Sequence, residues 1–173
     1  MNKIDLIRKL EKYPVFNLKA VKEIIEKDRN YTKIVIYRLK KDKLIFKIEK
    51  NKYTMHKDPI LIASNIIWPC YISNWSALRY YNLTEQLPKV ISIITTRTRK
   101  KREINFNNTK IIFTKIKPKY FFGYKKELYN SFYIFIAEKE KALIDSALFK
   151  KISFSEICDI FTDNIKVINI DLF

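Results

Sequence analysis

The stretch from residue 30 to residue 55 constrains the fold of this chain most, because its hydrophobic period changes abruptly from helical to strand-like. At about 100° per residue, one stripe of a helix collects Thr32, Val35, Ile36 and Leu39. From residue 45 to residue 50 the pattern becomes strand-like, and Asn51 and Lys52 then stand as turn residues. Asparagine tolerates the left-handed conformation that a tight hairpin needs. The stretch therefore predicts a helix followed at once by a small β-hairpin.

The outer face of this predicted helix is cationic and contains a tyrosine. Its candidate ligand-contacting residues are Arg29, Asn30, Lys33, Tyr37, Arg38, Lys40 and Lys41. The hairpin adds Lys47, Lys50 and Lys52, which are candidates for contacts with phosphate groups. The alternative interpretation is an amphipathic helix whose lysines are merely solvated, since charge runs on helices are common.

Two further helices are predicted upstream. Ile4, Ile7 and Leu10 are spaced at intervals of three within residues 3–11, which predicts a short first helix ending before Pro14. Asn17 is a good N-cap for a second helix. The buried stripe of that helix is predicted to be Leu18, Val21, Ile24 and Ile25. Three helices, a tight turn between the last two and a terminal hairpin predict a winged helix-turn-helix at residues 1–58, a fold whose third helix enters the DNA major groove.

The net charge favours a polyanionic partner. The chain has 35 Lys and Arg against 18 Asp and Glu, a formal charge of +17. Residues 1–58 carry a net +9 and residues 59–137 a net +10, whereas residues 138–173 carry −2. We therefore expect nucleic acid contacts in the first two segments. A membrane surface is a weaker alternative, because the cations alternate with core positions and form no single amphipathic anchor helix.

Composition excludes several other classes of function. A single glycine, Gly123, rules out glycine-rich phosphate loops. Cys70, Cys158 and the lone His56 match no metal-binding or redox spacing, so we expect two buried free thiols, no metal and no cofactor. No apolar run approaches the roughly 20 residues of a membrane span, and no signal-peptide pattern opens the chain. These features predict a soluble cytoplasmic protein.

Residues 59–173 predict a second, mixed domain. Helices are expected at residues 59–67, with Ile60, Ala63 and Ile67 on one side, and within residues 71–88, capped by Ser73 and ended by Asn82 as a left-handed C-terminal cap. A further helix is expected at residues 138–149, with Leu143, Ile144, Ala147 and Leu148 on its inner face. Strands are expected at residues 90–96, 104–106, 110–115 and 132–137, with a hairpin turn at Asn107 and Asn108 between the second and third, and an aromatic turn at residues 118–124. A capping box at residues 153–156 predicts a last short helix. The expected fold class is α+β, with the N-terminal winged helix-turn-helix at residues 1–58 followed by a mixed α/β C-terminal domain at residues 59–173.

A dense cation cluster lies between two of these strands. It consists of Arg97, Arg99, Lys100, Lys101 and Arg102. Such a run is common in solvated loops, but its density also makes it a candidate for a second contact with nucleic acid or for contact with an acidic partner.

Several short segments of the chain stand out together: residues 71–73 (YIS), 75–78 (WSAL), 83–88 (LTEQLP), 122–123 (FG) and 140–145 (EKALID). In these segments the chain resembles the AbiEi-type antitoxins, which are transcriptional autoregulators of type IV toxin-antitoxin systems. The segments occur in family order, and the likeness extends over about residues 16–149. Where the family usually has glycine, this chain has Lys43, Asn51 and Asn82. The resemblance implies an N-terminal winged helix that binds the operator of its own operon, a C-terminal domain needed for antitoxicity, and no catalytic site.

An enzymatic alternative rests on the acidic cluster that opens the predicted helix at residues 138–149. Glu138, Glu140 and Asp145 stand among lysines after a strand, as in part of a metal-dependent nuclease site. Such a site needs a further carboxylate from a neighbouring strand to hold Mg²⁺, and the predicted strands offer none. Glutamates in a first helical turn also complement the helix dipole. We therefore expect no enzymatic activity; Mg²⁺-dependent cleavage that Glu140→Gln abolishes would indicate a nuclease.

The sequence thus predicts sequence-specific double-stranded DNA binding for repression, by the autorepressing antitoxin of a toxin-antitoxin operon. The expected partners are an operator that is an inverted repeat, bound by two copies that pair on the DNA, and a nucleotidyltransferase-like toxin. A stand-alone transcription factor without an antitoxin role is the main alternative, and the neighbouring gene would distinguish the two.

Overall fold

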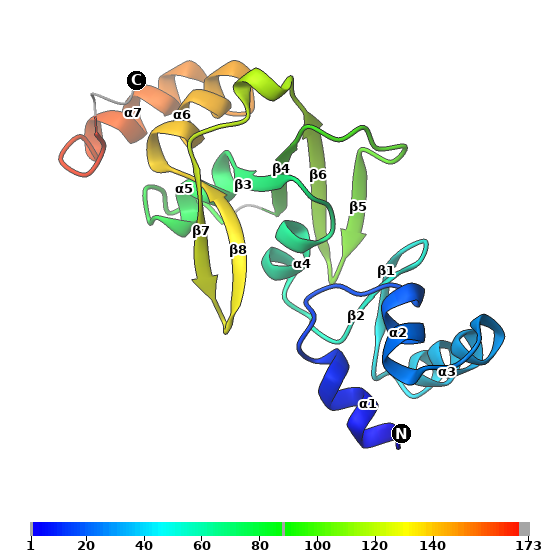
Figure 1. Ribbon diagram of the computed structural model, residues 1–173. Coiled ribbons are helices and arrows are strands. Elements are labelled where there is room, and N and C mark those ends of the chain that lie inside the picture. The colour runs from blue at the N-terminus through cyan, green and yellow to red at the C-terminus, as the bar shows by residue number, and fades with distance from the viewer. Residues whose placement is uncertain (1, 88, 170–173) are drawn as a thin grey trace.

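The chain folds into a helical N-terminal part and a larger part built around a β-sheet. The computed structural model describes residues 2–87 and 89–169. Figure 1 shows the first three helices at one end of the molecule, α6 and α7 at the other end, and the sheet between them. The fold is mixed α+β, as predicted.

Three short helices open the chain, each capped by a polar side chain. They are α1 (Lys3–Leu10), α2 (Leu18–Ile25) and α3 (Arg29–Lys41). Asn17 caps α2 as predicted, because its side chain accepts a hydrogen bond of 2.9 Å from the Ala20 amide. Asp28 caps α3 and accepts from the amides of Asn30 and Tyr31. These local bonds define where the helices begin.

These helices share a small hydrophobic core. Its buried members are Leu6, Leu10, Phe16, Val21, Ile36, Leu39 and Ile45. The prediction for α1 was wrong in one respect: Ile4 is 60% exposed, and Leu6 is buried in its place. Leu6 and Leu10 are four residues apart and also share a face, so the sequence spacing permits either rotation of the helix about its axis. Packing against the neighbouring helices selects one of them.

A two-stranded antiparallel hairpin follows α3. It pairs β1 (Phe46–Glu49) with β2 (Lys52–Thr54). The turn is at Lys50 and Asn51, so Lys52 begins β2 and is not a turn residue as predicted. Tyr53 of β2 also exchanges two backbone hydrogen bonds of 2.9 Å with Phe16, which precedes α2. The hairpin is thereby attached to the connection between the first two helices.

The larger part contains a six-stranded mixed sheet. Its strands are β3 (Cys70–Ser73), β4 (Val90–Thr95), β5 (Glu103–Phe106), β6 (Thr109–Lys115), β7 (Tyr124–Tyr129) and β8 (Phe132–Ala137). The spatial order is β5-β6-β4-β3-β8-β7. Pairs β4/β6 and β3/β8 are parallel, and the other neighbours are antiparallel. The central position of β3 means that its register depends on partners far away in the sequence.

The sheet confirms part of the prediction and corrects part of it. Strands β4, β5, β6 and β8 lie where they were expected. Tyr71–Ser73 was assigned to a helix capped by Ser73, but these residues form β3, and the helix begins only at Trp75. Strand β7 was not predicted, because its sequence YKKELY is too polar to resemble a buried strand. It is an edge strand, where such a composition is common.

Four helices accompany the sheet. They are α4 (Pro59–Asn65), α5 (Trp75–Tyr80), α6 (Lys139–Leu148) and α7 (Phe154–Asp163), and a 3-10 turn, η1, spans Pro118–Tyr120. The predicted capping box of α7 is present at Ser153 and Glu156. Helix α4 buries Leu61, Ile62, Ala63 and Ser64, whereas the stripe predicted for it was Ile60, Ala63 and Ile67. An almost continuously buried helix carries no polar face from which its rotation could be predicted.

The inner face of α6 was predicted correctly only in part, since Leu143 is buried as expected. The expected face comprised Leu143, Ile144, Ala147 and Leu148, but Leu148 is 55% exposed, and Ala147 is exposed as well. The buried side chains include the charged residues Glu140, Lys141 and Asp145. Helical periodicity predicts that the most apolar face of a helix is buried. In α6 the fold instead buries charged side chains, because they pair with partners inside the protein.

The three positions where the resembling family usually has glycine all have a left-handed backbone. Lys43, Asn51 and Asn82 have φ values of 56°, 59° and 56°. Asparagine tolerates this conformation, whereas the Cβ of lysine meets steric strain in it. Position 43 therefore carries a conformational cost that positions 51 and 82 largely avoid.

The two cysteines differ in environment, and only one matches the prediction. Cys70 is fully buried, and its burial raises the pKa of the thiol to about 12. Cys158 is exposed, although both thiols were predicted to be buried. No helix among residues 2–87 and 89–169 has both the length and the apolar character needed to cross a lipid bilayer.

We expect Lys43→Gly to raise the free energy of unfolding by about 0.5–1 kcal/mol, because glycine adopts a positive φ without a Cβ clash. Urea denaturation followed by circular dichroism measures the change. The matched control is Lys40→Gly, at an exposed position inside α3, which should lower stability by up to about 1 kcal/mol. Equal destabilisation by both variants would contradict a left-handed residue 43.

Candidate nucleic-acid interface

Helix α3 presents the most extensive exposed basic face of the N-terminal part. Its start is defined by Asp28, whose side chain accepts from the Asn30 and Tyr31 amides at 2.7 and 3.1 Å. The bonds from Tyr31 and Asn30 lower the pKa of the Asp28 carboxyl. Thr32, Ile36 and Leu39 are buried on the inner face. The rotation of α3 about its axis therefore agrees with the predicted stripe.

All seven helix residues proposed from the sequence are exposed. They are Arg29, Asn30, Lys33, Tyr37, Arg38, Lys40 and Lys41. In the part of the chain that the structure describes, none of their side chains forms an ion pair. Arg38 lies at the margin of this face, since it also lines a cavity of about 250 Å³ between α1 and α3. Such a surface keeps its cations available for a ligand.

Sequence reasoning missed one exposed apolar residue on this face. Ile34 is 48% exposed and Tyr37 is 65% exposed. A helical wheel centred on the buried stripe places Ile34 almost opposite the core, so the signal was present in the sequence. The face thus combines cations with two large apolar side chains.

The hairpin contains two exposed lysines and a third whose ammonium group makes contacts within the protein. Lys47 and Lys50 are exposed. Asn51, in the turn, accepts a hydrogen bond of 3.0 Å from the Leu18 amide, which holds the turn near the start of α2. The Lys52 ammonium instead lies 2.9 Å from a Glu49 carboxylate oxygen and donates to the Ile66 carbonyl. Lys52, proposed from the sequence as a phosphate contact, thus has internal partners.

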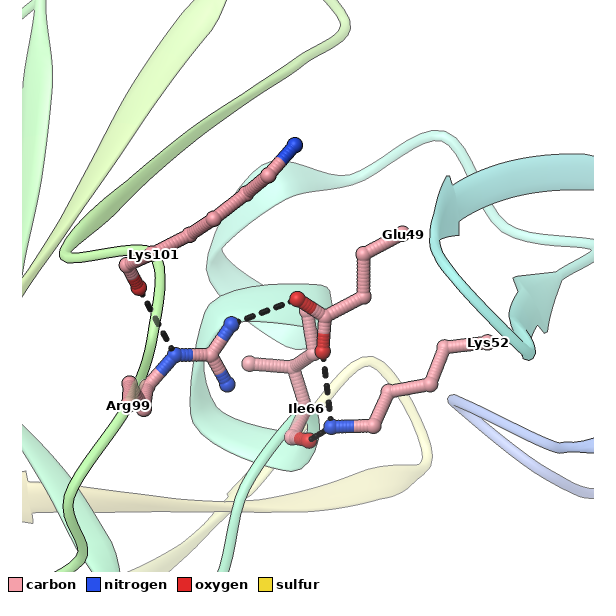
Figure 2. A network of polar contacts seen from close by, with 5 residues as sticks. All are labelled: Glu49, Lys52, Ile66, Arg99 and Lys101. Carbon is pink, nitrogen blue, oxygen red and sulfur yellow. Dashed lines mark hydrogen bonds and ion pairs between the residues drawn. The ribbon is translucent and has the colours of Figure 1, made fainter.

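Glu49 is the centre of a polar network between the hairpin and the sheet, which Figure 2 shows. Its second carboxylate oxygen lies 2.6 Å from an Arg99 guanidinium nitrogen. Arg99 also donates from Nε to the Lys101 carbonyl and stacks on the Phe113 ring, with 3.9 Å between the guanidinium carbon and the ring centroid. The side chain of Arg99 is only 9% exposed. The network joins β1, the end of α4 and the loop between β4 and β5.

The cations of the loop at residues 97–102 (the cation loop) therefore differ in their exposure. Arg97, Lys100, Lys101 and Arg102 are exposed, and Arg97 donates to the Trp68 carbonyl at 3.3 Å. Arg99, by contrast, is buried among internal partners. The run of charges in the sequence contains no signal for this difference, because Glu49 lies 50 residues away. The second candidate contact retains four of the five proposed cations.

The same network determines the charge state of Glu49. Burial alone would raise the pKa of this carboxyl, but the hydrogen bond from Lys52 and the nearby positive charges of Arg99 and Lys52 outweigh burial and lower it. Glu49 is therefore ionised throughout the neutral range.

Two of the three carboxylates considered for a nuclease site, Asp145 and Glu140, make internal contacts. Asp145 is fully buried, lies 2.7 Å from the buried Lys141 ammonium, and accepts hydrogen bonds from Tyr71 and Ser73. Burial, followed by the charge of Asp145, raises the pKa of Tyr71. Glu140 accepts from the Asn169 amide at 2.7 Å. Among the described residues, no group of three or more His, Cys, Asp and Glu side chains is arranged to hold a metal ion.

Comparison with known proteins identifies no family for this chain. No protein-family model matches it, and no curated protein matches it either.

We expect Glu49→Gln to lower the free energy of unfolding at pH 7 by about 1–3 kcal/mol, because Arg99 and Lys52 would lose a charged acceptor in a mostly buried site. The folded-state pKa of Glu49 is lowered, so the stability that its charge contributes is complete above its ordinary pKa of 4.5. That contribution is lost as the pH falls through the lower folded-state pKa.

Urea denaturation of both proteins at stepwise lower pH measures this effect, and the two free energies should converge only below the lowered folded-state pKa of Glu49. The matched control is Glu23→Gln, because Glu23 forms a distant, exposed pair with Lys19. That change should cost less than about 0.5 kcal/mol. A difference for Glu49→Gln that did not depend on pH would argue against the charged network.

Proposed function

We propose that this chain is a sequence-specific double-stranded DNA-binding transcriptional regulator, and that residues 1–58 act as a winged helix-turn-helix. The observation that carries the proposal is the exposed, basic outer face of α3, whose side chains form no ion pair with the residues that the structure describes. The order of elements supports it, since a β-bridge lies between α1 and α2, and a hairpin follows α3. The formal charge of +17 is consistent with a polyanionic ligand.

In this proposal α3 enters the major groove and the hairpin contacts the backbone. Asn30, Ile34 and Tyr37 contact base edges, since Asn30 and Tyr37 carry hydrogen-bonding groups and Ile34 an apolar one. Arg38, at the margin of the face, contacts the DNA backbone. Phosphate groups are contacted by Arg29, Lys33, Lys40, Lys41, Lys47 and Lys50. Lys52 pairs with Glu49 within the hairpin, so we propose no DNA contact for it.

We further propose that the regulator is the autorepressing antitoxin of a type IV toxin-antitoxin operon. This step rests on the resemblance of residues 71–145 to AbiEi-type antitoxins. In this proposal the sheet-containing part binds a nucleotidyltransferase-like toxin. The proposal includes no catalytic residue, metal or cofactor. Co-expression of the adjacent gene product tests it: relief of toxicity by the full chain supports the antitoxin role, and the absence of a toxic neighbour supports a stand-alone transcription factor.

The first functional prediction concerns salt and individual side chains. An operator selected from random duplexes by the full chain should bind with an affinity that falls by about 0.9 log units per log unit of salt for each phosphate neutralised. Lys41→Ala should weaken binding to all duplexes alike and reduce this slope by about one. Tyr37→Ala should instead change sequence preference, because its contact is with bases.

Fluorescence anisotropy at several salt concentrations measures these effects. The matched control is Lys89→Ala, which removes an exposed lysine beside β4, outside the α3 face. Affinity that is indifferent to salt, or equal losses for Lys41→Ala and Lys89→Ala, would refute the assignment of α3.

The second functional prediction concerns stoichiometry. One small winged helix reads only a few base pairs, so we expect two copies on an inverted repeat, with half-site centres about 10 base pairs or a multiple apart. Footprinting and native mass spectrometry should show a protected pair of half-sites and two chains per duplex. A single protected half-site with one chain would contradict this expectation.

A further inference from the structure

A basic cavity lies beside the cation loop, on the sheet-containing part of the chain. Its volume is about 390 Å³, and its floor includes Ile112 and Phe113 of β6. The cations that line it are Arg97, Arg99, Arg102, Lys115 and Lys151. They come from the loop after β4, from the end of β6 and from the segment after α6. The tertiary fold thus gathers five positive charges at one concave site.

The charge of this cavity is poorly compensated. No Asp or Glu is among the described residues that line it. Glu49 pairs with Arg99 from the hairpin side and offsets one of the five charges. The remaining four cations are exposed, and like charges gathered around one cavity repel one another. An arrangement of this kind is stabilised by an anion with several negative charges.

The lining combines fixed and free side chains. Arg99 is held between Glu49 and the Phe113 ring, and Lys115 donates to the Thr98 hydroxyl at 2.6 Å. Arg102 and Lys151, in contrast, are exposed, and their side chains make no hydrogen bond or ion pair within the described part of the chain. The fixed guanidinium gives the site a preformed wall, while the two free cations can close on a ligand.

We propose that this cavity binds the phosphate chain of a small di- or triphosphorylated molecule, such as a nucleoside triphosphate. Guanidinium groups match phosphate oxygens in a bidentate geometry, and a triphosphate carries three to four negative charges, which matches the uncompensated cations. The volume lies within the range of small-ligand pockets. Arg99, whose side chain is 9% exposed and donates to Glu49 and to the Lys101 carbonyl, forms a wall of the cavity. The exposed Arg102 and Lys151 are left to contact the phosphate oxygens.

This site is separate from the proposed DNA face, and its test requires no DNA. The full chain at low salt is titrated with tripolyphosphate, ATP and orthophosphate by isothermal calorimetry. Tripolyphosphate should bind with a dissociation constant in the micromolar range, and orthophosphate at least about tenfold more weakly, because it reaches fewer cations. Tighter binding of ATP than of tripolyphosphate would identify a nucleotide as the ligand; equal binding would identify the phosphate chain alone as the recognised group.

Two variants localise the binding. Arg102→Gln and Lys151→Gln should each weaken tripolyphosphate binding by about tenfold or more, since each removes a charge-assisted contact. Both side chains are exposed and unpaired, so thermal denaturation should show unchanged folding. The matched control is Lys89→Gln, which removes the same charge outside the cavity and should leave binding within about twofold.

Three results would overturn the proposal. The first is the absence of tripolyphosphate binding at about millimolar ligand, a concentration that detects even weak sites. The second is an equal loss in Lys89→Gln, which would indicate a general charge effect. The third is that Arg102→Gln and Lys151→Gln weaken the binding of duplex DNA but not that of tripolyphosphate, which would make the cavity a contact for the DNA backbone.

Discussion

Glu49 holds the hairpin against the sheet, and the relation between the two hydrophobic cores depends on that attachment. Its two carboxylate oxygens pair with Lys52 in the same hairpin and with Arg99 in the sheet-containing part. Beside it, Ile48 is buried in the core of the sheet, whereas Ile45, three residues earlier, belongs to the core of the helices. Burial of one isoleucine contributes about 1.5–3 kcal/mol, comparable to a charge-assisted hydrogen bond. Polar and apolar contacts of similar size therefore join the two parts at one short strand.

A second set of buried charges orients α6 on the sheet. Asp145 accepts from Tyr71 and Ser73 of β3 and pairs with Lys141 one turn away on the same helix. Desolvation of such a pair largely offsets its attraction, so its contribution to net stability is small. Removal of one partner, however, would leave an uncompensated charge, which costs about 3–5 kcal/mol. The network therefore favours one orientation of α6, and it engages Asp145, one of the three carboxylates considered for a nuclease site.

The basic surfaces of this protein fall into two kinds. Helix α3 displays an exposed face whose cations form no ion pair within residues 2–87 and 89–169, which suits the regular backbone of a duplex. The cation loop instead contributes to a recessed cavity, where Arg99 is already fixed by Glu49. Because Glu49 belongs to the hairpin that we propose to contact DNA, the two surfaces share one ion pair. The two basic surfaces therefore differ in how many of their cations are buried in internal contacts and how many are exposed to a ligand.

The sequence by itself determined the features that arise from neighbouring residues. These features depend on interactions within a few residues, so the local sequence pattern was sufficient to predict them. They are the Asn17 cap of α2, the left-handed Asn51 and Asn82, the capping box at Ser153 and the hairpin turn at residues 107–108. The apolar runs of β4 and β8 were likewise sufficient to predict buried strands.

Only the tertiary structure decided the features that depend on distant partners. Strand β3 has just four residues and no alternation, and its pairing with β8 joins Ile72 to Ile136. The charged inner face of α6 is tolerated because β3 supplies hydroxyl donors to Asp145. Arg99 looks like its neighbours in the sequence, and only Glu49, brought close by the fold, distinguishes it from the exposed cations. Local hydrogen bonds are encoded by adjacent residues, whereas burial and ion pairing are decided by which distant segments come into contact.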